Sequence, residues 1–335
     1  FRPVYTAAFC AWLVFGLFYV RATLKRFQGT RYAMRDGGLH LILLGKAWQE
    51  RRFWRVAKNP RVRTTILGIC VKAFFTPLMT GFLAGHTNAI ASAWMRHKGL
   101  PPLKIDIPRG VNALAQASAW WSQVKVRLPS FSDFGGLFAP STWTQADVSW
   151  GLGFAYDIVF FVDCGWALMG YASESRWLGN KTRSVEPTGF GWVVCLACYP
   201  PFNNVLGTYL PLENGPARIS SETTLLVLRG ITVLLFAVYA SATVAFGFKF
   251  SNLTHRGIVS RGPYRLVRHP AYLCKCTAWW LEHIPTMTPT KALFLTGLCG
   301  VYALRAWTEE RHLGRDPEYR AYKKKVPWVL IPGVY

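Results

Sequence analysis

The segment TTLLVLRGITVLLFAVYASATVAFGF, residues 223–248, decides the fold class of this chain. It carries one charged side chain, Arg229, and it is long enough to cross a membrane as a helix, because a hydrocarbon core about 30 Å thick needs roughly 20 apolar residues. Further segments reach or approach that length at residues 4–22, 65–84, 148–172, 190–210, 271–284 and 289–307. The sequence therefore predicts an all-α, polytopic helical membrane protein with about seven transmembrane helices.

The composition agrees with a membrane protein better than with a nucleic-acid-binding one. Of the 335 residues, 51% are hydrophobic, and yet the formal net charge is +23. A nucleic-acid-binding module gathers its basic residues on one polar face, whereas here Lys and Arg fall in clusters between the apolar segments. We therefore expect membrane lipids as partners and no nucleic acid, and membership of a membrane protein complex stays open.

The distribution of the basic residues also predicts how the chain is oriented. Short loops rich in Lys and Arg remain in the cytoplasm, and residues 23–63 are dense in both. Counting alternating spans from there puts Asn180, residues 250–270 and the C-terminal tail on the same, cytoplasmic side. The two prolines of PTMTP, residues 285–289, indicate a tight reversal, so we expect the last two segments to form a helical hairpin.

The chain divides into two regions at residue 248. Residues 1–248 form an N-terminal membrane region with five spans, a basic inner loop at 23–63 and an external cap at 95–147, and residues 249–335 contain the hairpin and the tail. Residues 39–56 alternate apolar and basic side chains. That pattern suits either a helix lying in the inner membrane interface or an ordinary basic loop.

Polar residues inside the predicted spans have structural interpretations. Asp157 and Asp163 are candidates for function because carboxylates inside a membrane are costly. On one helix their separation points them in different directions, so hydrogen bonds to neighbouring helices are favoured over a paired acid–base role. Pro200 and Pro201 break the fourth segment. The paired cysteines of CLAC (195–198) and CKC (274–276) have no second Cys/His pair nearby, so no metal site is predicted.

The chemistry is concentrated in the C-terminal third. RGPYRLVRHPAYLCKC (261–276) precedes the hairpin, and RAWTEERHL (305–313) follows it. A hairpin returns the chain to the side where it began, so Arg305, Glu309 and Glu310 should come close to His269 and Tyr272. Cationic, acidic and aromatic groups together suit a zwitterionic ligand such as S-adenosylmethionine. A patch that merely binds anionic lipid heads is the alternative, but it does not explain the glutamates.

These motifs carry a family resemblance. GPYRLVRHPAY (262–272), RAWTEERHL (305–313), DPEYRAYKKKVPW (316–328) and IPGVY (331–335) together resemble the integral-membrane methyltransferases of the isoprenylcysteine carboxyl methyltransferase and phospholipid methyltransferase superfamily. The resemblance covers residues 249–335. It implies an enzyme that transfers a methyl group from S-adenosyl-L-methionine to a lipid-like or prenylated acceptor at the cytoplasmic membrane interface.

The resemblance also implies roles for single residues. Arg305 stands where the family has an arginine that faces the methyl acceptor, which makes it the candidate catalytic residue. The hairpin geometry adds Glu310 to the cofactor site that the family motifs imply. The candidate cofactor-binding residues are Arg256, Gly257, Ile258, Val259, Tyr264, His269, Pro270, Ala271, Tyr272, Glu309 and Glu310.

Departures from the family pattern leave the lipophilic acceptor undefined. The Gly-x-Gly element of the phospholipid enzymes is missing at the matching place, and Leu273, Cys274 and Lys275 follow the His-Pro-x-Tyr element where a small residue is usual. Lys275, at the start of a span, must reach the interface or pair with an acid such as Glu310. Two other functions stay open: an NADPH-dependent enzyme resembling the sterol reductases, and a membrane scaffold or accessory subunit that keeps the fold without catalysis.

Overall fold

The structure is a computed structural model, and it describes residues 14, 37–99, 143–175, 177–209 and 212–334. The predicted first span at 4–22 lies outside the described residues except for residue 14, and so does most of the predicted external cap. The described part of the chain is mostly helical.

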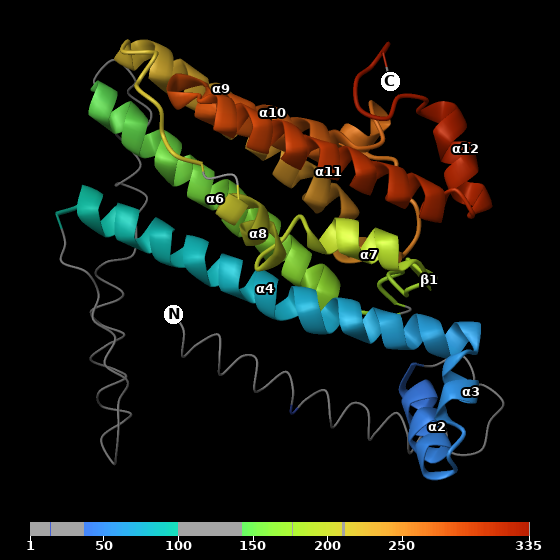
Figure 1. The fold of residues 1–335 in the computed structure, drawn as a ribbon. Helices are drawn as coiled ribbons and strands as arrows, with labels where there is room; N and C mark the ends of the chain where they lie inside the picture. The colour runs from blue at the N-terminus through green and yellow to red at the C-terminus, as the bar shows by residue number, and fades with distance from the viewer. Residues whose placement is uncertain (1–13, 15–36, 100–142, 176, 210–211, 335) are drawn as a thin grey trace, which may run out of the picture.

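Three long helices pack side by side as the core of the molecule (Figure 1). They are α4 (Pro60–His97), α6 (Gln145–Ala172) and α9 (Glu222–Phe246), and α6 lies between the other two. Each is long and apolar enough to cross a membrane. They contain the predicted spans at 65–84 and 148–172 and residues 223–246 of the predicted span at 223–248, so the helical structure of those three segments is confirmed.

Side-chain caps determine where these helices begin. The side chain of Thr144 accepts a hydrogen bond from the backbone of Asp147, and the Asp147 side chain accepts one from the backbone of Thr144, which is a capping box. Ser221 caps α9, and Asn59 caps α4 just before Pro60. Each cap satisfies backbone N–H groups that would otherwise lack a partner.

The fourth predicted segment, 190–210, forms two short helices instead of one. These are α7 (Gly189–Leu196) and α8 (Phe202–Tyr209), of 8 residues each. The predicted break at Pro200 and Pro201 is therefore confirmed, because proline cannot continue the backbone hydrogen-bond ladder. Neither helix is long enough to cross a bilayer alone.

The predicted helical hairpin is confirmed. It consists of α10 (Pro270–His283), the 3₁₀ turn η6 (Ile284–Thr286) and α11 (Pro289–Leu313), and α10 also packs on α9. With 14 residues, α10 is shorter than the roughly 20 needed to span a hydrocarbon core. In the described part of the chain, then, three helices meet the criteria for a span, and the count of seven stays a prediction.

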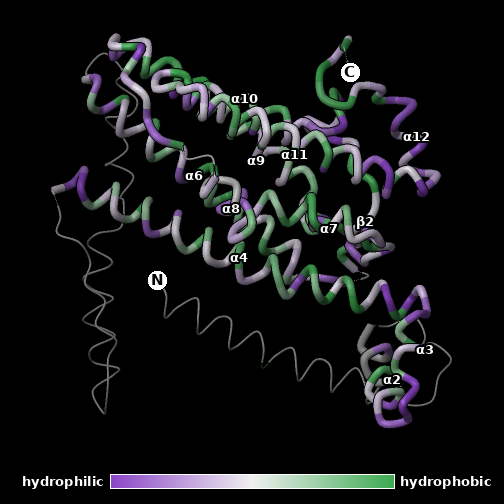
Figure 2. The backbone as a smooth tube through the Cα atoms, in the orientation of Figure 1, coloured by the Kyte–Doolittle hydropathy of each residue, from purple (hydrophilic) through white to green (hydrophobic). Residues whose placement is uncertain are grey.

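The connections after α6, α9 and α11 meet at one end of the helices (Figure 1). Here β1 (Ser184–Val185) pairs antiparallel with β2 (Thr254–His255), next to the 3₁₀ turns η4 (Gly247–Lys249) and η5 (Gly262–Arg265) and to α12 (Pro317–Lys325). The side-chain amide of Asn180 donates to the Phe248 carbonyl across this end, at 3.0 Å. Hydrophilic residues gather at α12 (Figure 2).

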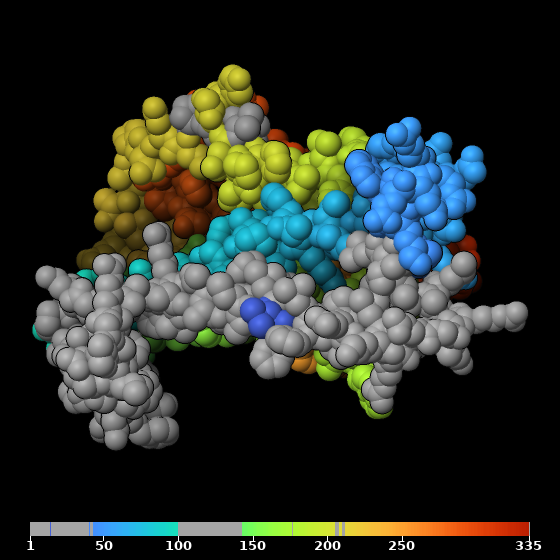
Figure 3. Space-filling view, turned by 90° about the horizontal axis from the view of Figure 1, so that it is seen from below, coloured from blue at the N-terminus to red at the C-terminus, as the bar shows by residue number. Residues whose placement is uncertain are grey.

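The basic segment at 39–56 is helical. It forms α2 (Gly37–Gln49) and α3 (Phe53–Ala57), which pack against the start of α4. Seen from below, they form a separate mass at one end of the molecule (Figure 3). Trp48 and Trp54 are 70% and 76% exposed, as expected of aromatic residues that contact a membrane interface. Contact with a membrane at this surface stays a prediction.

The carboxylates inside the core bind neighbouring helices as predicted. Asp163 of α6 accepts hydrogen bonds from the hydroxyls of Tyr239 at 3.0 Å and Thr243 at 2.5 Å, both on α9. Asp157 lies 3.0 Å from the imidazole of His86 on α4. The two carboxylates thus hold α6 against different partners.

Candidate functional site

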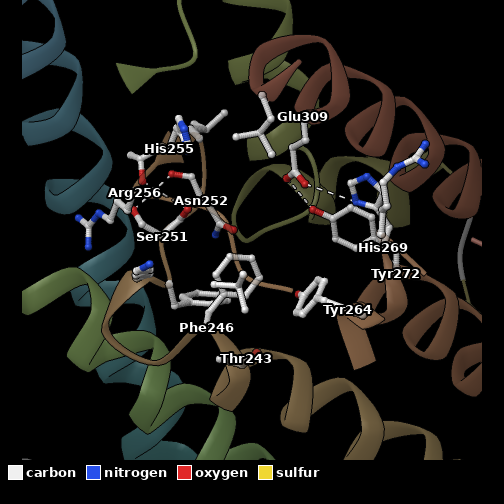
Figure 4. A pocket seen from close by; sticks show the side chains of 18 of the residues that line it. Thr243, Phe246, Ser251, Asn252, His255, Arg256, Tyr264, His269, Tyr272 and Glu309 are labelled. Carbon is white, nitrogen blue, oxygen red and sulfur yellow. Dashed lines mark hydrogen bonds and ion pairs between the residues drawn. The ribbon is translucent and has the colours of Figure 1, made fainter. Parts of the chain in front are cut away.

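A cavity lies where the end of α9, the loop after it and the α10–α11 hairpin meet. All the predicted site residues except Pro270 and Glu310 line it. The loop residues around Asn252 and Arg256 lie on one side, and Glu309, His269 and Tyr272 lie on the other (Figure 4). The structure therefore brings together the stretch of sequence that leads into the hairpin and the stretch at the end of its second helix.

Glu309 is the acidic group of the cavity. The Tyr272 hydroxyl donates to its Oε1 at 2.6 Å, and Arg305 Nε donates to the same oxygen at 3.2 Å. His269 Nδ1 lies 3.8 Å from the other oxygen, Oε2. The Glu309 side chain is 29% exposed, so this second oxygen is accessible to a ligand in the cavity.

Arg305 is buried, and most of its guanidinium is already engaged. Besides Glu309, it donates to Asn252 Oδ1 at 2.6 Å and to the Tyr199 hydroxyl at 3.4 Å. Its guanidinium carbon lies 5.2 Å from the ring centroid of Tyr272 and 5.4 Å from that of Tyr199. A buried cation is stable only with such partners. Arg305 lines the cavity as predicted, but its contacts join the 250–259 loop to the hairpin.

Arg256 and Gly257 lie on the loop side of the cavity, and the Arg256 guanidinium is directed away from Glu309, toward the end of α6 (Figure 4). Arg256 is 3% exposed, and its NH1 donates to the Gly170 carbonyl at 2.5 Å. Burial lowers the Arg256 pKa, and the Glu174 carboxylate, 4.0 Å away, opposes that shift. Within the described part of the chain, Arg256 Nε is buried and has no partner. Gly257 has φ +104°, a backbone conformation that favours glycine, and the Lys249 ammonium lies beside it.

The C-terminal tail holds the His-Pro element in place. The backbone N–H groups of Arg268 and His269 donate to the carbonyls of Trp328 and Val329 at 3.0 and 2.9 Å. Arg268 NH1 also donates to the Val326 carbonyl at 2.9 Å. These bonds explain why the tail motif accompanies the site motif in the sequence.

Tyr264 is held by the same tail. The Tyr322 hydroxyl donates to the Tyr264 carbonyl at 2.7 Å, and the Tyr264 ring packs edge-on against Phe246 of α9, with centroids 4.9 Å apart. Its ring therefore forms a fixed part of the cavity wall.

Glu310, predicted to bind the cofactor, is instead placed behind the cavity wall. It accepts hydrogen bonds from Arg268 Nε at 2.8 Å and from the Tyr319 hydroxyl at 2.5 Å. It also lies 3.2 Å from His269 Nε2 and 2.8 Å from Lys323 Nζ. Burial alone would raise the Glu310 pKa, but these bonds together hold it below its ordinary value. The physical reason for the placement is the helix, which turns about 100° per residue and directs Glu309 and Glu310 to different sides.

Two other predicted contacts differ in the structure. Pro270 does not line the cavity. It is the first residue of α10, a position that suits proline because its missing N–H and fixed φ fit the start of a helix. The ammonium of Lys275 lies over aromatic rings and not beside Glu310. The suggested Lys275–Glu310 pair is therefore wrong.

Some cavity residues were not predicted from the sequence. Asn252 and Tyr199 hydrogen-bond each other at 3.0 Å and both contact Arg305. Asn252 lies four residues before Arg256, and Tyr199 directly precedes the Pro200–Pro201 break, so both lie next to positions that the sequence singled out. No local sequence pattern indicated that these two segments contact each other in the fold.

Comparison of the chain with protein-family models, with curated proteins and with solved structures finds no match. The chemistry of the site therefore rests on the residues that form it.

Proposed function

We propose that this protein transfers a methyl group from S-adenosyl-L-methionine to a lipophilic acceptor at a membrane. The observation that carries the proposal is the polarity of the cavity. Lys249 and Arg256 lie on one side and Glu309 on the other, with the rings of Tyr264 and Tyr272 in the same lining. A ligand that combines a carboxylate, an ammonium group, hydroxyls and an aromatic base is complementary to such a lining.

The residues fit this cofactor on structural grounds. The Lys249 ammonium lies beside Gly257 in the lining, where it can pair with a carboxylate, and Glu309 can accept hydrogen bonds from a hydroxyl or an ammonium group. Lys249 would hold the carboxylate, and Glu309 would hold hydroxyls or the ammonium group. When bound, S-adenosylmethionine supplies a methyl group that passes to the acceptor, while the electron pair of the broken carbon–sulfur bond stays on sulfur.

The protein's own contribution would be alignment. Tyr272 and Arg305 fix the Glu309 carboxylate, and the tail fixes His269. Positioning two reactants in this way supplies several kcal/mol of a transfer barrier without a strong base. Because α9 and α10 both line the cavity, a lipophilic acceptor would enter between elements of the membrane region.

Binding of S-adenosylhomocysteine to the detergent-purified protein tests the proposal. Calorimetry should give micromolar affinity, and Glu309→Gln or Lys249→Met should weaken it about tenfold or more, because each removes a charged hydrogen bond. Glu213→Gln, on an exposed loop residue away from the cavity, is the matched control and should bind as the natural sequence does.

The same measurement distinguishes the other two functions. Binding of NADPH in place of S-adenosylhomocysteine would favour a reductase, and binding of neither would favour a scaffold. Either outcome would refute methyl transfer.

A further inference from the structure

Lys275 is a cation in the lining of the cavity, about one turn along α10 from Tyr272. Its ammonium nitrogen lies 5.1 Å from the ring centroids of Tyr239 and Trp279 and 5.6 Å from that of Tyr302. These rings belong to α9, α10 and α11, so the charge lies between three helices of the membrane region. Such cation–π contacts offset part of the cost of placing a lysine there.

The hydrogen-bond donors of the Lys275 ammonium group have no acceptor among the residues that the structure describes. An ammonium group has three such donors to satisfy. Asp163 attracts it electrostatically. The two oxygens of that carboxylate, however, accept hydrogen bonds from Tyr239 and Thr243. Lys275 therefore presents free donors to the cavity that it lines.

The other cations of the cavity have different positions or partners. Arg305 donates to Glu309, Asn252 and Tyr199. Arg268 donates to Glu310 and to the carbonyls of Val326 and Pro327. Lys249 and Arg256 lie on the far side, at the loop assigned above to the cofactor. Lys275 is thus the cation left to meet a second ligand, and the hydroxyl-bearing rings of Tyr239 and Tyr302 lie beside it.

We propose that Lys275 determines acceptor specificity by binding the negatively charged head group of an amphiphilic acid. This inference rests on the proposed function and names the class of its acceptor. A buried ammonium group with free donors favours an anion over a neutral or cationic head, because removing either charge leaves the other uncompensated. An anionic acceptor also needs no general base, since it carries no proton at the reacting atom.

Binding of a fluorescent fatty acid tests the proposal without any turnover. The probe is dansyl-labelled undecanoic acid in detergent micelles, compared with its methyl ester. The natural protein should bind the acid about tenfold more tightly than the ester, and Lys275→Met should abolish that preference. Lys275→Arg keeps the charge and should keep the preference.

Two controls separate the site from surface charge and from misfolding. Lys324→Met removes an exposed lysine of α12 and should leave the preference unchanged. Lys275→Met should still bind S-adenosylhomocysteine with the affinity of the natural sequence, which also shows that it is folded. If Lys275→Met does not fold, the comparison is made with Lys275→Gln, which keeps hydrogen-bonding capacity without the charge and should also lose the preference.

The outcomes for the two proposals are distinguishable. Equal binding of acid and ester by the natural protein, or an unchanged preference in Lys275→Met or Lys275→Gln, would overturn the role of Lys275. Failure of the natural protein to bind S-adenosylhomocysteine would refute methyl transfer, while an intact acid preference would still support an anion site at Lys275.

Discussion

Glu309 and Glu310 are neighbours in the chain with different roles in the structure. Glu309 faces the cavity and contacts Tyr272 and Arg305, whereas Glu310 lies behind it among Arg268, His269, Tyr319 and Lys323. The first carboxylate is available to a ligand. The second supports the residues that form the wall.

Replacing Glu310 should destabilise the protein in a pH-dependent way. Glu310→Gln leaves Arg268 and Lys323 without their acid, which should cost about 3 kcal/mol and lower the melting temperature. The folded-state pKa of Glu310 lies below the ordinary 4.5. Its stabilising effect is therefore fully present above that pH and is lost as the pH falls through the lowered value.

Melting curves followed by tryptophan fluorescence measure this effect. The difference in melting temperature between the natural protein and Glu310→Gln should be constant from neutral pH down to about pH 5 and shrink below that. A difference that grows on acidification would contradict the prediction. Glu318→Gln is the matched control, because its carboxylate is 59% exposed and pairs with a surface arginine.

At the scale of elements, the site depends on a segment that does not itself line it. The tail after α12 supplies backbone carbonyls to Arg268 and His269. Tyr322 of α12 holds the backbone of Tyr264. Buried donors that lose such partners cost free energy, so the tail and the His-Pro element should form and unfold together.

Truncating the tail tests this dependence. Removing residues 326–335 takes away the carbonyl acceptors at Val326, Pro327, Trp328 and Val329, and should abolish S-adenosylhomocysteine binding and lower the melting temperature. Removing only residues 333–335 keeps all four carbonyls and should leave both properties unchanged. Calorimetry and melting curves of the two shortened chains check the prediction. Unimpaired binding after the longer truncation would show that the tail does not support the site.

On the scale of the whole molecule, the loops after α6 and α9 meet at one end, where Asn180 contacts Phe248. The same end carries the hairpin termini and α12. A membrane crossed by α4, α6 and α9 would therefore leave all of them on the same side. The positive-inside rule predicts that this side is the cytoplasm.

Reporter fusions test the orientation. Green fluorescent protein joined after residue 335 should fluoresce, since it folds in the cytoplasm. Alkaline phosphatase inserted in the predicted external cap, near residue 115, should be active only outside. The opposite result in both fusions would show that the orientation is the reverse of the predicted one. If only one fusion gave the expected result, the predicted number of spans between the two points would be wrong.

The sequence by itself determined the helices and their hairpin. Apolar length marked α4, α6 and α9, and local signals such as the Pro200–Pro201 break and the prolines before α11 marked where helices end, because these depend on neighbouring residues alone. The hairpin predicted from the sequence also placed Glu309 near His269 and Tyr272.

Only the tertiary structure decided which side chains face the cavity. Glu310 lies behind it, Asn252 and Tyr199 engage Arg305, and Lys275 lies among rings from three helices. The direction of a side chain changes by about 100° with each helical residue, and its partners come from segments far away in the sequence. Those partners are fixed by packing, which no local pattern encodes.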